Sequence, residues 1–233
     1  MTIGAIIQCR LDSSRLPGKV LLPAAGKPLL WYLLARCRTI SELGGGASVV
    51  VATSQRPVDE PIVDYCRQNG IRVYRGPAED AAKRLIEAAQ EAGFSHFFRM
   101  NGDSPFIEHP LVAEAASRAA GSAYDFVTNL HPRSFPYGVS VELVRTAALA
   151  GAYPRFASAE HREHATLFFL ERMAQVPHYN ISNGADLSGV RMAIDTLEDF
   201  RSFERVVAAV GARWPALSFR EALPFYAGAG ARR

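Results

Sequence analysis

The chain has 233 residues, of which 48% are hydrophobic and 21% charged, and its net charge at pH 7 is +3. These are ordinary values for a globular protein, and they exclude a disordered chain, a disulfide scaffold and a strongly basic nucleic-acid-binding protein. We expect a single domain over residues 1–233 that binds neither nucleic acid nor a membrane, since no apolar run is long enough to cross a bilayer.

The cysteines indicate a reducing compartment. Cys9, Cys37 and Cys66 are odd in number and far apart, and no C-x-x-C pair is present. This usage is typical of free thiols and not of a disulfide framework or a zinc site. The chain also enters an apolar segment at once, without the cationic stretch of a secretory signal. We therefore expect a cytoplasmic protein.

The first predicted element is a buried strand at residues 3–7, followed directly by a cationic loop. The loop contains Arg10, Arg15 and Lys19 together with two serines, a proline and a glycine. Open α/β sheets bind their ligands at the carboxyl ends of strands, which is where this loop lies. Three cations and two small hydroxyls suit a polyanion such as a triphosphate. A solvated basic turn is the alternative that the pattern alone leaves open.

After this loop, apolar segments of strand and helix type alternate along the chain. Buried strands are predicted at residues 47–52, 71–74, 96–100 and 124–128, and helices at residues 28–37, 59–69, 79–92 and 110–120. Such alternation predicts an α/β fold with a mostly parallel twisted sheet and helices on both faces.

Polar residues follow two of these strands. Thr53 comes at the end of the second strand, and Asn101 and Asp103 lie in the turn after the fourth. An aspartate in a turn commonly serves only the turn itself. At a strand end that faces a triphosphate, however, Asp103 is also well placed to hold Mg²⁺, which takes one or two carboxylates and keeps most of its waters.

The alternation breaks over residues 129–183, which contain four prolines, a possible strand at 139–143 and a predicted helix at 159–173. We expect this segment to leave the sheet as an excursion that supplies substrate contacts and subunit contacts. His161 and His164 lie near one face of the predicted helix, but no H-E-x-x-H motif is present, which disfavours a metal site. A helix start that contacts substrate and a solvated polar face both remain open.

A last strand is predicted at residues 189–194, with Asp195 at its end and a helix that begins near Thr196. For this sequence alone, a helix N-cap is the favoured interpretation of Asp195 or Thr196. Paired with Asp103, Asp195 becomes a candidate second carboxylate for Mg²⁺. The glycine-rich tail after Pro224 is expected to fray.

Several motifs together resemble one enzyme superfamily. The segment from Cys9 to Leu21 is similar to A-R-x-x-S-x-R-L-P-G-K-x-L, which begins sugar nucleotidyltransferases that use CTP, with cysteine in place of alanine. Asn-Gly-Asp-Ser-Pro, Tyr-Gly-Val-Ser-Val-Glu, Arg-Glu-His-Ala-Thr and Ile-Asp-Thr-Leu-Glu-Asp follow in order. The whole pattern resembles the acylneuraminate and Kdo cytidylyltransferases, especially the branch named for spore-coat polysaccharide biosynthesis. That branch carries G-S-x-x-D-V-L-x-R where this chain has residues 76–84.

This resemblance implies a nucleotide-diphospho-sugar transferase fold of the GT-A-like type and a homodimer built by the excursion. It implies transfer of CMP from CTP to an acidic sugar, nonulosonic or Kdo-like, with release of pyrophosphate, for bacterial surface-glycan biosynthesis. Mg²⁺ is the implied cofactor. The implied nucleotide contacts are Arg10, Leu11, Ser13, Ser14, Arg15, Lys19, Thr53 and Asn101. The implied catalytic residues are Arg10, Arg15, Lys19 and Asp103, and the implied metal ligands are Asp103 and Asp195. The implied sugar contacts are Tyr137, Glu142, Arg162 and His164.

Two other classes of protein share parts of this pattern. A GT-A-type glycosyltransferase shares such a sheet but normally carries a D-x-D metal motif, whereas Asn101-Gly102-Asp103 supplies one carboxylate. A non-catalytic nucleotide-binding protein is disfavoured because all three loop cations and both aspartates are present. Among nucleotidyltransferases, another acceptor such as a phosphonate stays open, because kinship of fold does not choose a substrate.

Overall fold

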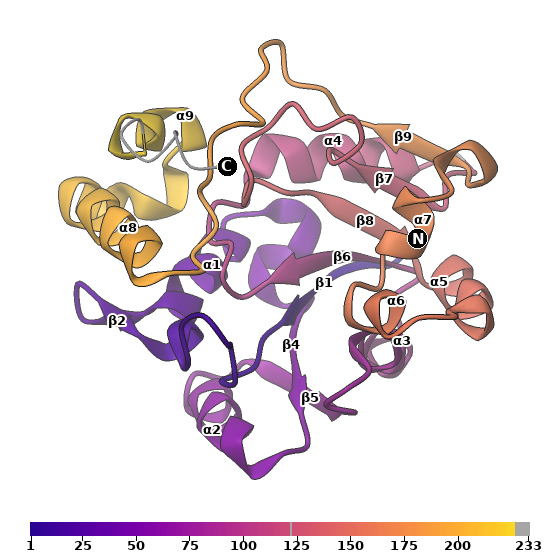
Figure 1. The fold of residues 1–233 in the computed structure, drawn as a ribbon, viewed down its shortest axis with the longest axis horizontal. Helices are drawn as coiled ribbons and strands as arrows, with labels where there is room; N and C mark the ends of the chain where they lie inside the picture. Colours follow the sequence, from indigo (N-terminus) through magenta and orange to yellow (C-terminus); the bar gives the residue numbers. More distant parts are fainter. Residues whose placement is uncertain (122, 227–233) are drawn as a thin grey trace.

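A single mixed sheet forms the centre of the computed structural model, which describes residues 1–121 and 123–226 (Figure 1). The end of the tail, from residue 227, lies outside the described residues. The sheet has seven strands in the order β5-β4-β1-β6-β8-β7-β9. These strands are β1 (Ile3–Gln8), β4 (Val49–Ser54), β5 (Arg72–Gly76), β6 (His96–Asn101), β7 (Phe126–Thr128), β8 (Glu142–Arg145) and β9 (His178–Asn180). A small antiparallel ribbon joins β2 (Pro23–Ala24) to β3 (Lys27–Pro28).

Helices cover both faces of the sheet, as the sequence predicts (Figure 1). They are α1 (Leu29–Cys37), α2 (Glu60–Gln68), α3 (Ala81–Ala92), α4 (His109–Ala119), α5 (Thr146–Ala152), α6 (Ala159–Glu163), α7 (Leu167–Leu170), α8 (Leu197–Val210) and α9 (Phe219–Ala222). One buried cluster joins the sheet to α1, α2, α4 and α8, and a second joins the other face to α3, α5 and α7. In the described part of the chain, no helix is long and apolar enough to span a bilayer.

The parallel strands bring three loops to one edge. Strand β1 pairs in parallel with β4 on one side and β6 on the other, so that Gln8 lies opposite Ala52 and Asn101. Side chains alternate along β1, with Ile6 in one buried cluster and Ile7 in the other. The segments that follow β1, β4 and β6 therefore begin at the same edge of the sheet.

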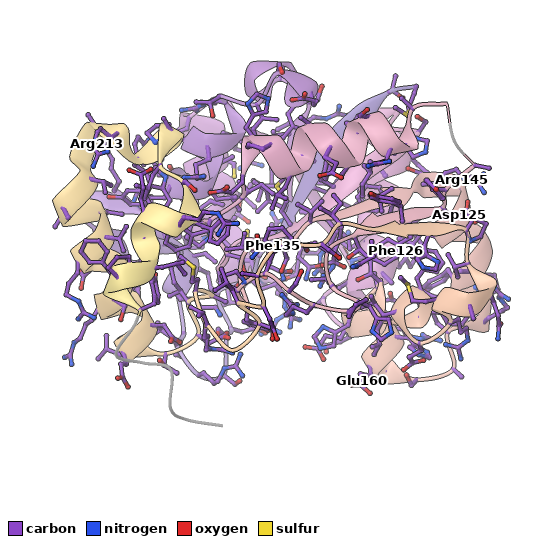
Figure 2. The ribbon with its side chains drawn as sticks, turned by 90° about the horizontal axis from the view of Figure 1, so that it is seen from above. Asp125, Phe126, Phe135, Arg145, Glu160 and Arg213 are labelled. Atoms are coloured by element: carbon purple, nitrogen blue, oxygen red, sulfur yellow. The ribbon has the colours of Figure 1, made fainter. Side chains whose placement is uncertain are left out.

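The segment at residues 129–183 does not stay outside the sheet, contrary to our expectation. Strand β8 lies between β6 and β7 and is antiparallel to both, and β9 pairs with β7. The side chain of Asn129 stabilises the segment that leads from β7 back into the sheet at β8. Its amide group accepts a hydrogen bond from Val141 N and donates one to Val139 O, each at 2.9 Å. At the far end of β8, Arg145 lies beside Asp125 (Figure 2).

The predicted helix at residues 159–173 is also wrong in its length. It forms two short helices, α6 and α7, because His164 has non-helical dihedral angles of φ −112° and ψ 75°. Ser158 caps α6 by accepting from His161 N at 3.1 Å. The turn between the two helices carries Thr166, whose hydroxyl donates to Glu142. The sequence periodicity alone did not reveal this tertiary bond.

Residues 189–194 do not form the strand that we expected. Only an isolated bridge joins Arg191 to Tyr137. The amides of Met192 and Ala193 both donate to the carbonyl of Tyr137, at 2.6 and 3.0 Å. Directly after this segment, Thr196 caps α8 in a reciprocal capping box with Asp199, which confirms the favoured interpretation.

A substitution at Gly138 tests the close contact between this residue and the segment at residues 192–193. Its φ is +102°, and an added Cβ would lie 2.3 Å from Ala193 N. We expect Gly138→Ala to lower the free energy of unfolding by more than about 1 kcal/mol, measured by urea denaturation. The matched control is Gly184→Ala, whose added Cβ meets no atom within 4 Å. Equal urea midpoints for the two variants would show that the contact does not constrain the fold.

Candidate active site

A cleft of about 590 Å³ opens where the segments after β1 and β6 begin. Nine of the predicted site residues line it: Arg10, Ser13, Ser14, Arg15, Lys19, Asn101, Asp103, His164 and Asp195. They come from four separate stretches of the chain, so the fold brings the basic loop, the turn after β6, the α6–α7 turn and the segment before α8 to one place.

Lys19 lies at the centre of the polar network. Its ammonium donates to Asp103 Oδ2 at 2.6 Å, to Asp195 Oδ1 at 2.9 Å and to the carbonyl of Ile194 at 3.0 Å. These three acceptors match the three donors of the ammonium group. Gly18 adopts φ +72° just before the 3₁₀ turn that Lys19 begins, a conformation that favours glycine. The Lys19 side chain is only 8% exposed.

Asp195 receives two further cations. Arg15 Nη2 lies 2.5 Å from Asp195 Oδ1, and Arg191 pairs with the other carboxylate oxygen. Burial raises the pKa of the Asp195 carboxyl, but the hydrogen bonds and charges of Lys19 and Arg15 outweigh burial, so this pKa lies below its ordinary value. The hydrogen bond to Asp195 raises the pKa of Arg15. Asp195 is therefore an ionised carboxylate at neutral pH.

Asp59 holds the basic loop against the sheet, a role that the sequence analysis missed. Its carboxylate is fully buried and accepts from Leu11 N at 2.7 Å and from the hydroxyl of Ser54. The backbone amide of Leu11 thus points to Asp59. Leu11 was predicted to contact the nucleotide, but it does not line the cleft. The only sequence signal for this role was that Asp59 begins a predicted helix. Aspartate is common at the start of any helix, so this signal does not identify a site residue.

Arg84 is a second site residue that the sequence motifs did not identify. It lines the cleft and is 2% exposed, and its Nε has no hydrogen-bond partner among the residues that the structure describes. Arg84 and Arg10 both donate to the carbonyl of Ala78, at 3.4 and 2.8 Å. Burial and the nearby Arg10 cation lower the pKa of Arg84. Two guanidinium groups thus lie side by side on this wall and favour an anionic ligand.

Besides Leu11 and Tyr137, three further predicted contacts do not line the cleft. Thr53 is fully buried on β4, and Glu142 is buried in an ion pair with Arg99 at 2.6 Å. Arg162 is half-exposed, with its nearest carboxylate, on Asp80, at 3.8 Å. None of the three lines the cleft. Tertiary contacts, such as the hydrogen bond from Thr166 to Glu142, determine which of these side chains are buried or paired, and no local motif shows such contacts.

Tyr137 lies beside the cleft and not in its wall. The guanidinium of Arg191, which pairs with Asp195, stacks on the Tyr137 ring with its Cζ 4.6 Å from the ring centroid. Arg133 approaches the same ring at 5.2 Å. The Tyr137 side chain is therefore connected to the site through Arg191.

Asp103 and Asp195 are the residues that fit a divalent cation. Both carboxylates lie within hydrogen-bond distance of the single Lys19 nitrogen, so a hard cation near this point finds oxygen ligands from both. Two carboxylates with the phosphates of a nucleotide suit Mg²⁺. The described residues contain no group of three or more histidine, cysteine or acidic side chains arranged for a metal. His161 instead pairs with Glu171 at 2.9 Å.

The arrangement suits direct displacement at phosphorus. Cys9 lines the cleft, but burial raises the pKa of its thiol far above neutrality, so it is no thiolate nucleophile. Four cations, five carboxylates and two serine hydroxyls line the space instead. Charge neutralisation and positioning are the main contributions that a protein makes to phosphoryl and nucleotidyl transfer.

Comparisons with known proteins agree with this chemistry. A family model described as "Cytidylyltransferase" matches residues 4–223. The spore coat polysaccharide biosynthesis protein SpsF of Bacillus subtilis (strain 168) is 31% identical over 225 residues, which span 89% of this chain and 87% of the relative. A 3-deoxy-manno-octulosonate cytidylyltransferase of Geobacter sulfurreducens is 37% identical over 125 residues, or 52% of this chain and 46% of that protein.

Solved structures show the same fold. A cytidylyltransferase from Leptospira borgpetersenii serovar Hardjo-bovis superposes with a TM-score of 0.90 at 24% identity, covering 100% of this chain and 98% of the other. CMP:2-keto-3-deoxy-manno-octonic acid synthetase complexed with CTP gives a TM-score of 0.65 at 17% identity, covering 90% and 99% of the two chains. Because the family model spans almost the whole chain and the cleft holds the expected cations and carboxylates, this chain belongs to the cytidylyltransferase family and is a CTP-dependent nucleotidyltransferase.

Proposed function

We propose that this enzyme transfers CMP from CTP to a hydroxyl of an acidic sugar, nonulosonic or Kdo-like, with release of pyrophosphate. The product would serve bacterial surface-glycan biosynthesis. The observation that carries the proposal is the Lys19 ammonium held between Asp103 and Asp195 in a cleft that Arg10, Arg15 and Arg84 also line. The names of two relatives, one of polysaccharide biosynthesis and one that acts on a sugar acid, support the choice of acceptor class.

The sugar hydroxyl attacks the α-phosphorus in line, and the new O–P bond forms as the bond to the pyrophosphate oxygen breaks. Negative charge grows on the leaving pyrophosphate, where Arg15 and Lys19 neutralise it and the hydroxyls of Ser13 and Ser14 donate hydrogen bonds. Arg10, which lies beside Arg84, holds the nucleotide. Mg²⁺, which Asp103 and Asp195 would hold, supplies further neutralisation of the phosphates. The hydroxyl proton leaves to solvent or to a carboxylate of the site.

The experiment is pyrophosphate release with Mg²⁺, testing each of the four nucleoside triphosphates against a panel of sialic, legionaminic, pseudaminic and Kdo sugars. We expect release that requires CTP and one sugar acid. Consumption of a nucleotide-sugar donor without pyrophosphate release would contradict the proposal and favour a glycosyltransferase. Light scattering of the same protein tests the proposed homodimer, which should have twice the mass of the chain.

Removing either carboxylate should slow the chemical step. Asp103→Asn and Asp195→Asn each leave the shape of the side chain unchanged but remove a charge that Lys19 and Mg²⁺ require. We expect kcat to fall by about 100-fold or more, the size typical of losing one preorganised electrostatic group. Asp186→Asn changes an exposed carboxylate that does not line the cleft; it is the control and should retain wild-type kcat. Wild-type turnover in either site variant would remove the metal assignment.

The low pKa of Asp195 also makes a prediction about stability. A carboxyl with a depressed folded-state pKa stabilises the fold above its unfolded pKa of about 4, and this contribution is lost as pH falls through the lower folded value. The difference in unfolding free energy between wild type and Asp195→Asn should therefore be constant from about pH 8 to 5 and should shift against wild type below about pH 4. Urea titrations at several pH values measure it. A pH-independent difference would mean that the Asp195 pKa is not depressed.

A further inference from the structure

Beside the cleft, an exposed aromatic ring carries two guanidinium groups. Tyr137 is 44% exposed, with Arg191 at 4.6 Å from its ring centroid and Arg133 at 5.2 Å. Arg191 also pairs with Asp195. Contacts therefore run without interruption from Arg133 through the Tyr137 ring and Arg191 to a carboxylate of the active site. A cation over a tyrosine face is held in place by the ring's quadrupole.

The charges of these arginines are balanced differently. Arg15 and Arg191 both pair with Asp195. Across residues 1–121 and 123–226, Arg133 has no carboxylate within ion-pair distance, and its Nη1 is buried without a hydrogen-bond partner. Burial lowers the pKa of Arg133, although the more distant Glu142 acts in the opposite direction. A partly buried guanidinium without a counter-ion is costly, and an anionic ligand would offset that cost.

The loop that carries Arg133 is held firmly before any ligand binds. His131 N donates to Asn180 Oδ1 at 3.0 Å, and the carbonyl of Ser134 accepts from Leu187 N at 2.9 Å. Phe135 is buried against Phe219, and Figure 2 shows it near the middle of the molecule. A rigid scaffold lowers the cost of ordering a binding group.

We propose that Arg133 binds the carboxylate of the acceptor sugar and so selects acidic acceptors. This inference rests on the proposed function, because it assigns the acid group of that acceptor to a residue. Tyr137 and Arg191 link the guanidinium to Asp195, near which the acceptor hydroxyl would meet the α-phosphorus. A guanidinium fork matches a carboxylate with two parallel hydrogen bonds. Arg162 fits this role less well, since it is half-exposed to water and has the carboxylate of Asp80 nearby.

The main test compares two variants with two acceptors. Arg133→Met should raise KM for the sugar acid by about 10- to 100-fold, the range for losing a charge-assisted hydrogen bond. The dissociation constant for CTP, measured by calorimetry, should not change. Arg133→Lys should restore part of the loss because it keeps the charge. The control is Arg155→Met, which removes a guanidinium that stacks on the Phe168 ring at 4.9 Å, away from the cleft.

The second acceptor is the same sugar with its carboxylate reduced to an alcohol. Wild type should use it as poorly as Arg133→Met uses the acid, and Arg133→Met should show no further loss, because the two changes remove one interaction. Equal losses of both acceptors in the variant would overturn the proposal. So would a wild-type enzyme that prefers a sugar phosphate over the sugar acid and depends on Arg133 to do so, since the subsite would then recognise phosphate.

A binding measurement separates failure of this inference from failure of the proposed function. If wild type releases no pyrophosphate with any sugar acid, the proposed acceptor class is wrong. Calorimetric titration of N-acetylneuraminate and Kdo into the protein with CTP present then tests Arg133 independently of turnover. Binding that wild type shows and Arg133→Met loses supports the subsite, and equal or absent binding in both proteins overturns it.

Discussion

The contact on which the site depends is the buried ammonium of Lys19. It joins the loop after β1 to the turn after β6 and to the segment before α8, residues that are 84 and 176 positions away along the chain. Two carboxylates so close together would repel each other strongly without a cation between them. The ammonium therefore determines both the shape of the cleft floor and the ionised state of Asp195.

The same segment before α8 connects the site to its flank. The carbonyl of Tyr137 accepts two backbone hydrogen bonds, from the amides of residues 192 and 193. Gly138 allows these two segments of the chain to approach closely. Arg191 contacts both the Tyr137 ring and Asp195. A shift of this segment would move a carboxylate and the neighbouring guanidinium groups together.

Much of the fold followed from local pattern. Buried apolar runs alternating with helical periodicity predicted the parallel half of the sheet, with helices on both faces, and that prediction is confirmed. The prediction failed where long-range pairing decides the structure. Strand β8 has only four residues and inserts between β6 and β7, and a hydroxyl bond from Thr166 to buried Glu142 accompanies the break between α6 and α7. Neither feature has a periodic signature.

The sequence by itself determined the chemistry of the site: three cations and two serines after the first strand, one aspartate after β6 and one before α8, in the order of a known family. Motifs could do this because the carboxyl ends of parallel strands meet at one edge. Only the tertiary structure decided which side chains face the ligand. It buried Thr53 and Glu142, added Arg84 to the cleft, and left Arg133 without a counter-ion beside it. Burial and pairing depend on residues far away in the chain, which no local pattern contains.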